Sequence, residues 1–116
     1  MRALDKTDSL RTWDALYKSY RSYQRCDDGA IAEGYSESVI RILADHWSTL
    51  PQLSRLAKHD AQFRRFVIRH VDATLNSDDV MLVRSKAKTA CPEGSNKLCS
   101  DLAKQTDAAL KEAGSP

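Results

Sequence analysis

Hydrophobic residues recur every three or four positions along most of the chain, which is the spacing of one face of an α-helix. Leu10, Trp13, Tyr17 and Tyr20 form such a stripe in the first segment. The same spacing returns in five later segments, one of them short. The predicted helices run from Thr7–Ser9 to just before Asp27, then over 29–47, 48–59, 60–75, 76–91 and 95–113.

Residues suited to helix ends separate these segments. Asp27 or Asp28 can accept hydrogen bonds from the free backbone N–H groups at the start of 29–47, and Asp60 can do the same for 60–75. No stretch shows convincing strand alternation. The pattern therefore predicts an all-α fold, a compact bundle of five to six helices with short loops.

A chain of 116 residues has the size of a single domain. We expect one helical domain over 1–116, with frayed ends at 1–6 and 114–116. The 18 basic and 16 acidic residues give a net charge of only +2, so no general attraction to nucleic acid or to an anionic membrane is expected. No segment approaches the roughly 18 apolar residues of a membrane span, and the first ten residues lack the apolar centre of a signal peptide.

The chain has three cysteines, at positions 26, 91 and 99. Between Cys91 and Cys99 the residues Pro92, Gly94 and Ser95 favour a turn, which would let the two sulfurs meet across a helical hairpin. The pattern predicts this disulfide; two buried reduced thiols are the alternative. Cys26 is then left as a free thiol.

Candidate chemistry is sparse. The histidines 46, 59 and 70 and the cysteines lack the close paired spacing of a structural zinc site. Cys26 stands beside Asp27 and Asp28, whose charges raise the pKa of a thiol and oppose thiolate formation. We therefore expect no catalytic residue, no metal and no cofactor.

Two acidic turns and one aromatic residue are candidates for binding a partner. The first turn holds Asp27 and Asp28, with Glu33 following in the next helix, and the second holds Asp78 and Asp79. Tyr35 near the first turn has two interpretations, an interface residue or a core residue. A third candidate is a basic set that could contact phosphates, comprising Arg55, Lys58, Arg64, Arg65, Arg69, Arg84, Lys86 and Lys88. Acidic residues are interleaved with this set, so a solvated surface explains it as well.

The stretches "CDDGAIAEGYSESV" at 26–39 and "FRRFVIRHVDATLNSDD" at 63–79, followed by the pair Cys91 and Cys99, resemble a known family. They are similar to the periplasmic immunity proteins that neutralise type VI secretion peptidoglycan amidases. The resemblance covers roughly residues 12–103. It implies an all-helical inhibitor, itself not an enzyme, that binds its cognate secreted amidase toxin and blocks the active-site cleft. It also implies a homodimer in the periplasm, and because this chain lacks the family's signal peptide, the mature form.

On this hypothesis, an acidic loop imitates the carboxylate-rich peptide stems of peptidoglycan inside the amidase cleft. Asp27, Asp28 and Glu33, or Asp78 and Asp79, are the expected contact residues, with Tyr35 beside the first turn. Two other functions stay open. One is a small cytoplasmic module that binds protein or nucleic acid, and the other is an enzyme that uses Cys26 with a histidine.

Overall fold

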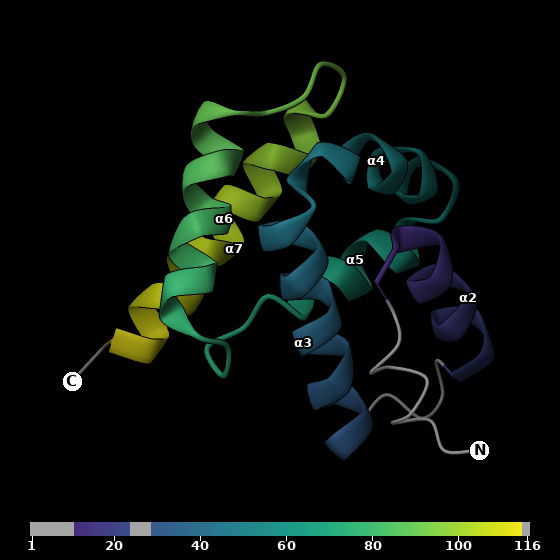
Figure 1. Cartoon of the computed structure of the whole chain (residues 1–116), viewed down its shortest axis with the longest axis horizontal. Helices are drawn as coiled ribbons and strands as arrows, with labels where there is room; N and C mark the ends of the chain where they lie inside the picture. The colour runs from purple at the N-terminus through teal and green to yellow at the C-terminus, as the bar shows by residue number, and fades with distance from the viewer. Residues whose placement is uncertain (1–10, 24–28, 115–116) are drawn as a thin grey trace.

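The computed structural model describes residues 11–23 and 29–114. Within them the chain forms six α-helices and one short 3-10 helix, drawn in Figure 1. The helices are α2 (Trp13–Tyr23), α3 (Gly29–Asp45), η2 (Trp47–Thr49), α4 (Leu50–His59), α5 (Ala61–Arg69), α6 (Ser77–Thr89) and α7 (Asn96–Gly114). The predicted all-α fold is therefore confirmed. No helix in the described ranges is long and apolar enough to cross a membrane.

The last two helices form an antiparallel hairpin, which makes up the left half of Figure 1. Helix α3 crosses this hairpin and packs on α6, while α5 packs on α7. Helices α4 and α5 contact each other, and α2 lies against α4 at the other side of the molecule (Figure 1). The two helices α3 and α5 thus connect the hairpin to the N-terminal half.

A cluster of aromatic rings fills the centre of the N-terminal half. The ring of Phe66 on α5 lies 4.6 Å from the ring of Tyr20 on α2 and 5.0 Å from that of Tyr35 on α3, measured between centroids. The His70 ring lies 4.4 Å from that of Phe66, and its Nδ1 lies 2.7 Å from the Phe66 carbonyl oxygen. Phe66 and Tyr35 are almost completely buried. One side chain therefore joins three helices.

Several helix ends differ from their sequence prediction. Helix α2 begins at Trp13, because the Thr12 hydroxyl accepts a hydrogen bond from the Ala15 N–H and caps the helix there. Helix α3 ends at Asp45, before the predicted Trp47, which leaves His46 exposed. Helix α5 ends at Arg69 and not near residue 75.

The early end of α5 has a visible cause in the turn that follows it. The Asp72 carboxylate accepts hydrogen bonds from the Thr74 N–H at 3.0 Å and from the Ser36 hydroxyl at 3.0 Å. Such a side-chain contact offers the backbone an alternative to continuing the helix. The bond to Ser36 also ties this turn to α3.

Cys91 and Cys99 form the predicted disulfide, with their Cα atoms 6.1 Å apart. Cys91 follows the end of α6 and Cys99 lies in the first turn of α7. Gly94 adopts a φ of 84° between them, a left-handed conformation that other residues rarely adopt. The disulfide therefore closes the tip of the hairpin. Cys26 lies outside the described residues.

Asp60 fixes the junction between α4 and α5. Its carboxylate accepts hydrogen bonds from the Phe63 N–H at 3.0 Å and from the Tyr17 hydroxyl at 3.1 Å, so it caps α5 and ties α2 to it. The bond from the Phe63 N–H is the main cause that lowers the pKa of Asp60 below its usual value, and the Tyr17 hydroxyl adds to it. The predicted cap is confirmed.

Replacing Asp60 tests the cap and its charge separately. Asp60→Ala should lower the free energy of unfolding by about 0.5–2 kcal/mol at neutral pH, the usual cost of losing a helix cap. Asp60→Asn keeps an acceptor for Phe63 but does not titrate. Because the folded pKa of Asp60 lies below the unfolded one, its charge stabilises the fold above the unfolded pKa of about 3.9. This contribution is lost as the pH falls through the folded pKa.

The advantage of the natural chain over Asp60→Asn should therefore shrink between about pH 5 and about pH 2, measured by urea unfolding. An advantage that stays constant over this range would show that the Asp60 charge does not contribute.

The disulfide predicts a thiol count and a stability loss. Protein folded without reductant and then unfolded should expose one reactive thiol out of three cysteines, and reduction should release the other two. The variant Cys91→Ser with Cys99→Ser should lose about 2–3 kcal/mol in urea unfolding, the chain-entropy effect of so short a loop. Cys26→Ser is the matched control and should leave no reactive thiol before reduction. Three reactive thiols in the air-oxidised protein would contradict the pairing.

Candidate functional site

The turn before α6 is held by side-chain hydrogen bonds. The Asn76 side chain accepts from the Asp78 N–H at 2.8 Å and from the Asp79 N–H at 3.4 Å, so it caps α6. Asp78 and Asp79 then occupy the first turn of the helix, where the positive end of the helix dipole stabilises their negative charges. The second acidic turn is therefore the capped N-terminus of α6.

Its two carboxylates have different surroundings. Asp79 is only partly exposed, and one of its oxygens lies 2.6 Å from the Arg41 guanidinium on α3. Arg41 also pairs with Glu37 and Asp45 of its own helix, at 3.4 and 3.3 Å. Asp79 therefore fixes α6 to α3, whereas Asp78 stands exposed beside it.

Two exposed apolar side chains lie next to the acidic residues at the start of α6. Met81 and Leu82 are the large hydrophobic residues that stay exposed in the described part of the chain, at 55% and 42%. Residues three and four positions apart are neighbours on a helix surface, so Asp78, Met81 and Leu82 form one patch. We call these three residues the α6 outer face. The opposite side of α6 packs into the core through Val80 and Val83.

Tyr35 corrects one expectation. Its side chain has no exposed surface, and its hydroxyl lies 2.9 Å from the Ser19 hydroxyl on α2 within hydrogen-bond distance. A residue buried in this way has no surface to offer a partner. The interpretation of Tyr35 as a binding residue is therefore wrong, and the core interpretation holds. Helical spacing fits both, and only the packing of α2 against α3 decides.

The first acidic turn cannot be compared with the structure. Asp27, Asp28 and the Glu33 side chain lie outside the described residues, so their binding role stays a prediction. Only the second turn has a described geometry. The α6 outer face adds Met81 and Leu82, which the sequence analysis did not select. The sequence does contain a sign of them: Met81 and Leu82 are hydrophobic although they lie between Val80 and Val83, which form the buried stripe of the helix.

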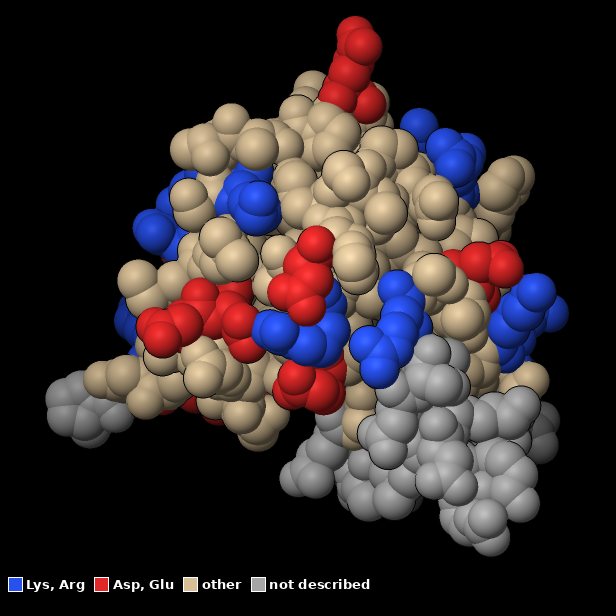
Figure 2. All heavy atoms as spheres, in the orientation of Figure 1, with Lys and Arg blue, Asp and Glu red and all other residues tan. Residues whose placement is uncertain are grey.

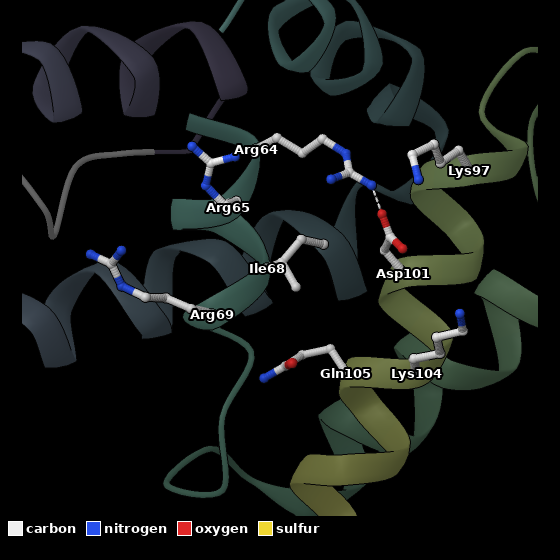
Figure 3. A pocket seen from close by; sticks show the side chains of 8 residues that line it. All are labelled: Arg64, Arg65, Ile68, Arg69, Lys97, Asp101, Lys104 and Gln105. Carbon is white, nitrogen blue, oxygen red and sulfur yellow. Dashed lines mark ion pairs between the residues drawn. The ribbon is translucent and has the colours of Figure 1, made fainter. Parts of the chain in front are cut away.

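The basic set predicted from the sequence divides into separate parts. Arg84 and Lys88 both pair with Asp107 of α7 and stay within the hairpin. On the face drawn in Figure 2, basic and acidic side chains are interspersed and no single sign dominates. The arginines of α5 lie elsewhere, beside an open hollow between α5 and α7, shown in Figure 3.

Metal binding and similarity to known proteins add no further site. The described residues contain no group of three or more His, Cys, Asp or Glu side chains placed to hold a metal ion. Comparisons with protein-family models, with curated proteins and with solved structures found no match to this chain. The resemblance to immunity proteins therefore stays a prediction from short motifs.

Proposed function

We propose that this chain is an immunity protein, which binds a type VI secreted peptidoglycan amidase and inhibits it by blocking the active-site cleft. In this role it has no catalytic activity of its own. The observation that carries the proposal is the α6 outer face, an exposed carboxylate beside two exposed apolar side chains on a rigid helix.

This face has the composition of a protein-binding surface. Exposed apolar side chains next to polar ones are common where proteins dock, because burying them on binding releases water from apolar surface. Methionine is enriched at interfaces and adapts its shape to a partner. Because Asn76 and the Arg41–Asp79 pair fix the start of α6, little conformational entropy is lost on binding.

The exposed carboxylate fits the target of such an inhibitor. The peptide stems that the amidase cleaves carry carboxylates, so its cleft must contain groups that receive them. Asp78 can enter such a cleft because its side chain is exposed, while Asp79 is held by Arg41. Met81 and Leu82 would then bury their apolar surface at the edge of the cleft.

The disulfide supports the compartment in this proposal. Disulfides form and persist in oxidising compartments, which in a bacterium means the periplasm. The peptidoglycan that the amidase attacks lies in the same compartment. A periplasmic location and a homodimer, both implied by the resemblance, are therefore part of the proposal.

Substitutions in the α6 outer face test the proposal. We expect the cognate amidase to be encoded by a neighbouring gene, and the natural chain should bind it with a dissociation constant of about 1 nM or lower, a free energy near −12 kcal/mol. Met81→Ser with Leu82→Ser, and separately Asp78→Lys, should each weaken binding by about tenfold or more, in line with interface positions that cost over 1 kcal/mol. Isothermal titration calorimetry and inhibition of peptidoglycan cleavage measure both effects.

Glu93→Lys is the matched control, because Glu93 is exposed in the loop at the opposite end of the hairpin. It should leave the affinity within about twofold, as rim substitutions usually do. Asp27→Lys with Asp28→Lys tests the first acidic turn in the same assay. If the substitutions in both acidic turns and in the Met81–Leu82 pair all leave the affinity unchanged, the proposed binding surface is wrong. If the natural chain does not bind the amidase at all, the function is wrong.

A further inference from the structure

A hollow of about 600 Å³ opens between α5 and α7. Figure 3 shows Arg64, Arg65 and Arg69 on the α5 side and Lys97 and Lys104 on the α7 side. The half-buried Ile68 lies between the two rows and gives the hollow an apolar floor. A smaller hollow beside it shares Arg64 and Lys97 and adds Lys58 of α4. We call the two together the basic groove.

The charge of this groove differs from that of the whole molecule. Its main part contains five basic side chains and one carboxylate, that of Asp101. The lining therefore has an excess of four positive charges, whereas the complete chain has an excess of two. The rest of the chain is negative by two charges. The net positive charge of this protein is thus located at the groove, although most of its basic residues lie elsewhere.

Part of this charge is neutralised and part is available. Arg64 forms an ion pair with Asp101, drawn as the dashed line in Figure 3, which links α5 to α7 across the groove. Arg69 lies over the Phe66 ring at 5.6 Å. Arg65, Lys97 and Lys104 are exposed and form no ion pair with a described residue. These three cations are the ones a ligand would meet.

Their spacing indicates the shape of that ligand. Lys97 and Lys104 lie seven residues apart on one helix, which places them about 10 Å apart along the axis. A single small anion needs donors that converge within about 3 Å of its oxygens. Cations spread over two helical turns instead suit a chain that carries several negative charges. An extended peptide repeats its side chains on one face about every 7 Å, so carboxylates one or two repeats apart bracket the roughly 10 Å between the two lysines, and the long, flexible lysine side chains can cover the difference.

The lining also favours peptide over nucleic acid. Single-stranded nucleic acid is held by aromatic side chains on which its bases stack. No aromatic residue lines the basic groove in the part of the chain that the structure describes. Ile68 instead offers an apolar contact between two charged rows.

We infer that the basic groove binds an extended acidic segment of a partner protein, with its carboxylates on Arg65, Lys97 and Lys104 and an apolar side chain over Ile68. The groove lies on α5 and α7, and the α6 outer face takes no part in it. This inference therefore does not depend on the proposed function. The groove is a second binding surface, and its positive charge is opposite to the negative charge of Asp78 on the α6 outer face.

A labelled peptide tests the inference directly. The probe is a fluorescein-labelled peptide of about ten residues with alternating glutamate and leucine, long enough to span both hollows when extended. Fluorescence anisotropy with the full chain should show saturable binding that weakens as NaCl rises from about 50 to about 200 mM. Arg65→Glu with Lys104→Glu should weaken it by about tenfold or more, as reversal of two contacting charges does.

Two controls make the result specific. Arg55→Glu with Lys86→Glu produces the same change in net charge outside the groove and should change the affinity by less than about twofold. A second peptide with glutamine in place of glutamate should bind at least about tenfold more weakly. Arg65→Gln with Lys104→Gln repeats the test with a milder change, and a thermal melt checks that each variant is folded.

Three results would overturn the inference. The first is no saturable binding of the glutamate peptide, and the second is an equal loss in the groove variant and the charge-matched control. The third is tighter binding of a fluorescein-labelled oligothymidine of equal length that the groove variant also abolishes, which would make the groove a nucleic-acid site. Failure of any of these tests leaves the amidase assay above unaffected, because that assay uses the α6 outer face.

Discussion

The packing of Phe66, on α5, against side chains of α2 and α3 is the interaction on which the rest of the structure depends. Tyr20 of α2 and Tyr35 of α3 both contact its ring, so the crossing of these helices is set by one buried position on α5. Phe66 is buried in this contact, while its neighbour Arg65 is exposed and lines the basic groove. Because α3 is fixed in this way, Arg41 further along it reaches Asp79 and holds α6.

Much of this fold can be predicted from the sequence, because helical spacing and turn residues are local signals. The six helices, the Asp60 cap and the Cys91–Cys99 disulfide all follow from neighbouring residues. The site cannot be predicted to the same extent, because it depends on packing between distant segments. Tyr35 fits an interface or a core equally well until α2 is placed against it. Lys97 and Lys104 join the arginines of α5 only because α5 packs on α7.

The two proposed surfaces share one physical property. In each, the exposed side chains stand on a rigid helix, so little conformational entropy would be lost on binding. The α6 outer face combines one carboxylate with two apolar side chains, and the basic groove combines cations with an apolar floor. The disulfide closes the tip of the α6–α7 hairpin that contributes to both. On these two proposals, opposite charges at separate places would let one small domain bind an acid-receiving cleft and an acidic segment without competition between them.

The central claim is that the α6 outer face is buried in the complex with the amidase. Hydrogen exchange of the backbone amides, followed by mass spectrometry with and without the amidase, tests it most directly, because binding protects the amides at the interface. We expect slower exchange in the first half of α6 and in the turn before it, with little change at the tip of the hairpin around Glu93. Stable binding with protection elsewhere and none in α6 would contradict it.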